Sequence, residues 1–240
     1  MRYIEEARDC HKGSEIWVIG TGPSLDDFPA NFFDDKISIA LNFTFIAFPT
    51  CTYIHFYHQK VSRWILNNDI SLLEKSIITM PHESIVTLPQ LKDYLGGDYD
   101  GMMYVTTYGR SNMLDIRRSV DNIMDSSIDA TTRKRRAYAL CSMKTILHPA
   151  IQIAVILGAS KVTLAGCDAK TTVIKDDAHG KGMDLFSSQT KSTFSIGEQK
   201  GEAEPYSIWR SGVKYLADAF GSYGIDVQRY FYDIGYEKIV

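Results

Sequence analysis

The stretch Glu15–Leu25 reads EIWVIGTGPSL and joins a short apolar run to an abrupt turn. The run Ile16–Ile19 is β-branched and aromatic and too short for a helix, so it predicts a buried strand. The turn that follows is rich in glycine and polar residues and consists of Gly20, Thr21, Gly22, Pro23 and Ser24. Glycines allow a sharp turn, and proline suits a first helical turn. Outward amides and a helix dipole attract anions, so this turn predicts a nucleotide phosphate site, with a ligand-free structural turn as the alternative.

Two further strands are predicted soon after the first. Ile37–Leu41 and Thr52–Tyr57 are short apolar or aromatic runs, and Gln59–Asn67 has helical spacing. Three strands with short connections predict a doubly wound, mostly parallel sheet. Asn42 directly follows the second strand, where open α/β sheets bind ligands. It is therefore a candidate ligand contact, or else a turn residue.

The rest of the chain continues the alternation of strands and helices. Helices are predicted at Ile70–Thr79, Arg110–Ser127, Thr145–Leu157 and Glu204–Tyr223, and strands at Ser84–Leu88, Met102–Tyr108, Lys161–Ala165 and, as the last strand, Ile225–Tyr230. A polar stretch, Ala169–Glu202, lacks periodicity and is typical of a functional lid of about residues 169–203. The whole chain, 1–240, is expected to be a single α/β domain.

Composition narrows the class of protein. A net charge of −3 gives no global reason to expect a nucleic-acid partner. The four cysteines are scattered without a C-x-x-C pair, which argues against a zinc site and a disulfide framework. We find no signal-like leader and no run long enough to be a transmembrane segment. These features together predict a cytoplasmic protein.

Common nucleotide fingerprints fit the opening turn only in part. Gly20 and Gly22 match G-x-G-x-x-G, but Leu25 takes the place of the third glycine. Asn42 stands where an acidic residue would hold a ribose hydroxyl, so NAD binding is disfavoured. No G-K-[ST] follows, so the turn is not a phosphate loop of the nucleotide-hydrolase type.

Candidate chemistry lies in the second half of the chain. Asp168 follows the strand Lys161–Ala165 and is expected in the same crevice, to orient a hydroxyl or hold a metal, or else to cap a loop. His179 is a candidate general base on a polar loop, and the neighbouring Asp176 and Asp177 are candidate Mg²⁺ ligands. A solvated loop is the alternative for Asp176, Asp177 and His179. The basic run 133–136 is a candidate to steer or bind phosphate, with a solvated surface as the alternative. His55 and His148 are interpreted as structural.

Three blocks resemble known families. They read KGSEIWVIGTGPSLDD, ISIALNFTF and TILHPAIQIAVILGASKVTLAGCDA. The G-x-G-P-S-L opening resembles that of the bacterial sialyltransferases typified by the bifunctional Campylobacter-type enzymes. It also resembles the family of motility accessory factors and MptE-like archaeal 6-hydroxymethylpterin diphosphokinases. Both groups commonly have an asparagine after the second strand and a late G-x-D, here Asn42 and Gly166–Asp168.

The resemblance implies a Rossmann-like transferase that binds a nucleotide at the glycine turn. In the sialyltransferases the donor is CMP-sialic acid, and Thr21, Gly22, Ser24 and Asn42 would line the nucleotide site, with Thr145 nearby. The chain departs from that family because the loop after Asp168 lacks the tyrosines that hold the leaving phosphate, and because no histidine lies near the final helix. His179 instead resembles the arrangement in the diphosphokinase group.

The leading functional hypothesis is therefore a glycosyltransferase-like enzyme with a nucleotide-sugar donor and a small-molecule or glycan hydroxyl acceptor. His179 would deprotonate the acceptor, Asp168 would orient donor or acceptor, and the lid would exclude water. One alternative is a Mg²⁺-dependent diphosphokinase acting on a small alcohol such as a hydroxymethylpterin. Another is a nucleotide-binding module without catalysis.

Overall fold

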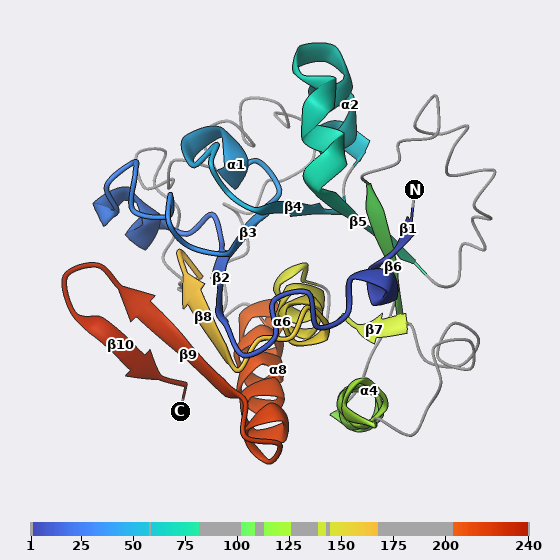
Figure 1. Cartoon of the computed structure of the whole chain (residues 1–240). Helices are drawn as coiled ribbons and strands as arrows, with labels where there is room; N and C mark the ends of the chain where they lie inside the picture. The colour runs from blue at the N-terminus through green and yellow to red at the C-terminus, as the bar shows by residue number, and fades with distance from the viewer. Residues whose placement is uncertain are drawn as a thin grey trace.

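The structure, a computed structural model, describes residues 2–57, 59–81, 102–108, 113–125, 139–142, 145–167 and 204–239. Within these ranges ten strands form one sheet, with helices on both faces (Figure 1). Every neighbouring pair of strands is parallel except the final hairpin. The chain therefore has the Rossmann-like α/β fold that the sequence predicts.

The order across the sheet is β1-β6-β5-β4-β3-β2-β8-β9-β10, and β7 pairs with β6 on the same side as β1. The strands are β1 (Arg2–Tyr3), β2 (Glu15–Ile19), β3 (Ser38–Leu41), β4 (Tyr53–Phe56), β5 (Ser76–Pro81), β6 (Met103–Tyr108), β7 (Ala139–Cys141), β8 (Lys161–Ala165), β9 (Asp226–Phe231) and β10 (Gly235–Lys238). The blue N-terminal and red C-terminal strands thus lie at opposite ends of the sheet (Figure 1).

Two layers of helices cover the sheet. One face carries α1 and α2, and the other carries α4, α6 and α8 (Figure 1). The α-helices are α1 (Thr44–Ala47), α2 (Gln59–Asn68), α4 (Met113–Met124), α6 (Leu147–Ile156) and α8 (Glu204–Gly221), and the 3₁₀ helices are η1 (Ile4–Ala7), η2 (Pro23–Asp27) and η3 (Ile70–Lys75).

The packing of β2 explains why its sequence is apolar from Ile16 to Ile19. Ile16 and Val18 pack in the large core cluster that α4, α6 and α8 share. Trp17 and Ile19 pack on the opposite face, in an aromatic cluster that includes Phe28. A parallel strand covered on both faces needs apolar residues at every position rather than at alternate ones. This explains the continuous run that marks the strand in the sequence.

Helix α6 lies at the centre of the molecule, and all ten of its residues are buried. It ends where predicted, because Gly158 has φ +102° and follows the last turn. The N-terminal loop satisfies the exposed carbonyls there: the amide of Asp9 donates to Ile156 (3.0 Å) and that of His11 to Leu157 (2.8 Å). The first residues of the chain therefore close the end of a helix nearly 150 positions later.

Three details differ from the sequence predictions. The helix predicted at Ile70–Thr79 is wrong. Asp69 accepts from the amide of Ser71 and caps only the short 3₁₀ helix η3, and the β-branched run that follows η3 forms strand β5. The strand Ile225–Tyr230 is present as β9 but is not the last, because Gly235 (φ +92°) turns the chain into β10. Strand β7 was not predicted, and the strand predicted at 84–88 lies outside the described residues.

Candidate functional site

The strand order reverses between β2 and β8. From β2 the chain builds β3, β4, β5 and β6 outward on one side, and β8 and β9 then occupy the other side. These strands are parallel, so their carboxyl ends meet at one edge. Ligands of open α/β sheets bind outside this edge at such a reversal. The predicted turn Gly20–Ser24, the predicted contact Asn42 and the segment Gly166–Cys167 all follow strands that end there.

Gly20 is required by the packing of two main chains. A Cβ at this position would lie 2.3 Å from the carbonyl oxygen of Gly166 and 2.8 Å from the Cys167 sulfur. The amide of Gly20 donates to the carbonyl of Ala165 at 2.8 Å. The first glycine of the turn therefore serves the contact between β2 and β8, and its amide is occupied within the protein.

Gly22 is also tied to the end of β8. Its amide donates to the carbonyl of Gly166 at 2.7 Å, which bridges the two loops at the strand-order reversal. The helix predicted after Pro23 is only the five-residue η2, a 3₁₀ turn whose dipole is correspondingly small. Thr21 makes no hydrogen bond among the described residues, so of these turn residues it is the one left with free polar groups.

Leu25 explains why the fingerprint lacks its third glycine. Its side chain is fully buried in the aromatic cluster with Phe28. A Cβ on Gly166, which has φ +62°, would lie 3.1 Å from this side chain. In a dinucleotide site the third glycine allows the helix to pack closely on the strand. Here Gly166, which follows β8, allows close packing against Leu25 instead.

Asn42 combines two unusual features at the end of β3. Its backbone is left-handed (φ +53°), a conformation that asparagine tolerates better than most residues. Its backbone N–H donates to the carbonyl of His55 at 2.9 Å, while its side-chain Oδ1 is buried without a hydrogen-bond partner among the described residues. Such an acceptor costs about 1–3 kcal/mol unless a donor reaches it.

Thr44 contributes a contact that the sequence did not reveal. Its hydroxyl, fully buried, donates to the carbonyl of Gly20 at 3.1 Å and so fastens the loop after β3 to the turn after β2. Asn42 lies two residues before it. The geometry of this edge therefore depends on the Thr44 hydroxyl, which the sequence alone does not distinguish from the hydroxyls of other threonines.

The positive end of helix α6 lies at the same edge of the sheet. The helix precedes β8 and packs against β2 and β3, so it runs antiparallel to the strands. Thr145 lies just before the N-cap residue Ile146: its Oγ1 accepts from the amide of Leu147 at 3.2 Å, and its carbonyl accepts from the Ser142 hydroxyl at 3.3 Å. The helix dipole expected from Pro23–Ser24 is therefore supplied by the longer α6 instead.

The two structural histidines are confirmed as core residues. His55 is fully buried, with Nδ1 2.9 Å from the carbonyl of Ile77 and Nε2 3.0 Å from the Thr79 hydroxyl. Burial lowers the pKa of His55 to about 4, so the ring is neutral at pH 7: Nδ1–H donates to Ile77, and Nε2 accepts from Thr79. His148 is likewise fully buried in α6.

The predicted catalytic and metal residues lie outside the described residues. They are Asp168, Asp176, Asp177 and His179, together with the lid of about residues 169–203 and the basic run 133–136. Their roles stay predictions. Within the described ranges, no group of three or more His, Cys, Asp or Glu side chains is arranged to hold a metal ion.

Two further observations concern the described part of the chain as a whole. None of its helices has the length and apolar character needed to cross a membrane. Comparison of the chain with protein-family models, curated proteins and solved structures finds no match.

Proposed function

We propose that the chain is a glycosyltransferase-like enzyme that binds a nucleotide-activated sugar at the carboxyl edge of β2, β3 and β8. Asn42 carries this proposal, because its buried Oδ1 lacks a donor beside the reversal of strand order. A base amino group or a ribose hydroxyl would supply that donor. The cost of the unpartnered acceptor would then be recovered as binding energy.

Two further groups suit the phosphate of such a donor. The N-terminus of α6 favours an anion through its dipole, an effect worth about 0.3–1 kcal/mol. The Thr145 hydroxyl uses an oxygen lone pair toward Leu147 and can still donate its proton. Amides of Gly20 and Gly22 play no part in this proposal, because both already donate to β8 or to Gly166.

The resemblance to sialyltransferases suggests a CMP-sialic-acid-like donor and supplies the proposed chemistry. His179 would take the proton of an acceptor hydroxyl as its oxygen attacks the anomeric carbon. The bond from that carbon to the phosphate oxygen would break, and CMP would leave with the bonding electron pair. Asp168 would orient donor or acceptor. The acceptor is a small molecule or a glycan.

Thermal unfolding with and without nucleotide tests the binding step. At a ligand concentration a hundred times Kd, a ligand that binds only the folded chain stabilises it by about 2.7 kcal/mol. We expect CMP to raise the midpoint. Stabilisation by ATP with Mg²⁺ and not by CMP would favour the diphosphokinase alternative and would contradict the sialyltransferase-like donor.

Asn42→Gly is the sharpest variant, because glycine accepts the left-handed backbone and removes only the amide side chain. We expect unchanged folding and about 5- to 30-fold weaker CMP binding, the loss of one or two hydrogen bonds. Undiminished affinity in this variant would overturn the role of Asn42.

His179→Ala should abolish sugar transfer while CMP binding survives, and retained transfer would remove His179 as the base.

A further inference from the structure

Arg229 lies on the helix-covered face of β9, one strand beyond the reversal of strand order. It pairs in register with Leu164 on β8 and with Glu237 on β10. Leu164 and the preceding same-face residue Val227 belong to the core shared with α4, α6 and α8. Residues paired across strands point to the same face, so the Arg229 side chain leaves the sheet on the side that α8 covers.

Arg229 is a partly buried residue whose Nε lacks an acceptor among the described residues. Its Nε is buried and makes no hydrogen bond. Glu237, directly opposite on β10, is exposed and makes no ion pair with it, although the ladder places the two residues side by side. Ion pairs among the described residues join other partners, such as Lys161 with Glu15 at 3.1 Å and Arg117 with Asp121 at 2.9 Å.

An unpaired arginine in this position is unusual on physical grounds. A buried N–H of a charged group loses its hydration, and without an acceptor that loss is not offset. Guanidinium groups present Nε–H and Nη–H as a planar fork that matches two oxygens of a carboxylate or phosphate. An oxyanion matches the shape and charge of this group.

The register between β9 and α8 shows which turn of the helix lies level with Arg229. Ile225 donates to the carbonyl of Phe220 and fixes the register between the helix end and β9. Arg229 lies four residues further along the strand, about 13 Å at 3.3 Å per residue, which corresponds to about nine helical residues. Counting nine residues back from Phe220 along α8 reaches Ser211, next to Gly212, which is buried. A glycine there presents no side chain toward its neighbours.

We propose that Arg229 binds one oxyanion, the phosphate or carboxylate group of a small ligand, on the α8-covered face of β9. This inference does not depend on a nucleotide at the neighbouring edge. Phosphate and carboxylate share the required chemistry, and inorganic phosphate and acetate distinguish them as probes.

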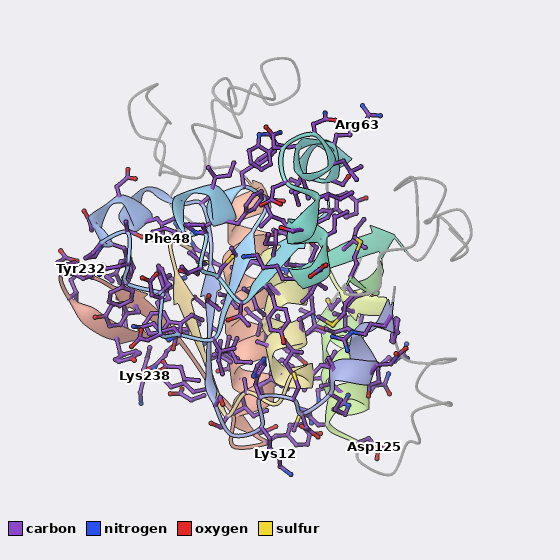
Figure 2. All side chains as sticks on the ribbon, turned by 45° about the horizontal axis from the view of Figure 1, so that its top comes forward. Lys12, Phe48, Arg63, Asp125, Tyr232 and Lys238 are labelled. Carbon is purple, nitrogen blue, oxygen red and sulfur yellow. The ribbon has the colours of Figure 1, made fainter. Side chains whose placement is uncertain are left out.

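The test compares Arg229→Gln with Arg63→Gln. Arg63 is an exposed arginine on α2, on the opposite face of the sheet, whereas Lys238 and Tyr232 mark the hairpin side of the molecule (Figure 2). Phosphate or acetate should stabilise the wild-type chain and the Arg63 variant equally. In the Arg229 variant the apparent affinity for the anion should fall about 10- to 150-fold, the loss of a charge-assisted hydrogen bond.

Stability without added anion separates this role from a structural one. Removing an unpaired cation should leave the unfolding midpoint within about 2 °C of the wild type, or raise it. A midpoint several degrees lower would show that Arg229 is held by a partner within the chain and would overturn the proposal.

A direct readout avoids any doubt about folding of the variant. In the wild-type chain labelled with ¹⁵N, the Nε–H resonance assigned to Arg229 should shift on titration with phosphate or acetate, while that of Arg63 stays in place. An Arg229 resonance that moves no more than that of Arg63 with either anion would exclude the site.

Discussion

At the scale of single residues, Gly20 and Gly22 make contacts within the protein that the glycine pattern of the sequence does not reveal. Gly20 lies where two main chains meet, and the Gly166 carbonyl occupies the space of a side chain. The amides of Gly20 and Gly22 are used between β2, β8 and the loops that follow them. Asn42 keeps a buried side-chain acceptor without a partner at this edge.

Gly20→Ala should therefore destabilise the protein strongly. The new Cβ would meet backbone atoms at 2.3 Å, so the two strands must separate, at about 3 kcal/mol. Urea unfolding measures this change. Gly221→Ala is the matched control, because a Cβ there meets nothing within 4 Å at the end of α8, and its stability should be equal or higher. Equal destabilisation of both variants would contradict the packing explanation.

His55 predicts how stability depends on pH. The unfolded histidine binds a proton below about 6.5, whereas the folded pKa is about 4 because the ring is buried. Between these values the unfolded state holds more protons, so stability decreases as the pH falls from 6.5 to 4. The shift corresponds to about 3 kcal/mol across that window.

His55→Asn tests this dependence, because an asparagine amide can still donate to Ile77 and does not titrate in this range. Urea unfolding at pH 7, 5.5 and 4.5 should show a weaker loss of stability in the variant than in the wild type. Parallel pH curves for the two proteins would contradict a neutral buried imidazole. Carboxylates titrate in both proteins and cancel in the difference.

At the scale of secondary-structure elements, one side chain fastens α6 to β7. The Gln152 amide is fully buried and donates to the carbonyls of Cys141 (2.9 Å) and His148 (2.9 Å). Its Oε1 accepts from the amide of Cys141 (3.1 Å) and the hydroxyl of Ser119 (2.5 Å). Gln152 thus engages both main-chain polar groups of Cys141, as a neighbouring strand would.

Gln152→Leu should leave several buried polar groups without partners, at about 1–3 kcal/mol for each such group after relaxation, and reduce the free energy of unfolding by several kcal/mol. Gln228→Leu on β9 is a suitable control: Gln228 is only partly buried, makes no side-chain hydrogen bond among the described residues, and should change stability by about 0.5 kcal/mol or less. A small effect of Gln152→Leu would show that the network is not needed to hold β7.

At the scale of the whole molecule, the candidate site is an outcome of topology. Residues 20, 42 and 166 are far apart in the chain, yet the strand order places β3, β2 and β8 side by side with their carboxyl ends together. The same order separates the two termini to opposite sheet edges and leaves the β9–β10 hairpin beyond the reversal (Figure 1). Arg229 lies on the α8-covered face because its register with Leu164 places both side chains on the same side of the sheet.

Strongly apolar segments could be predicted, and weakly marked ones could not. Strands β2 and β8 and helix α6 are continuous or nearly continuous apolar runs with glycine at one end, so local composition suffices. Strand β7 has three residues and is held by the side chain of Gln152, a partner that no local pattern shows. Strand β10 is exposed and polar and depends on pairing with β9.

The sequence by itself determined the α/β class and the opening strand and turn, and it predicted the positions around Gly20 and Asn42 as candidate ligand contacts. Periodicity and turn residues are local properties of the sequence, so they can be recognised without knowing which residues contact one another in the fold. Only the tertiary structure decided which polar groups remain unused. The Gly22 amide is occupied by Gly166, whereas the oxygen of Asn42 and the Nε of Arg229 are buried without partners, because hydrogen bonding between distant segments is settled by strand order and packing.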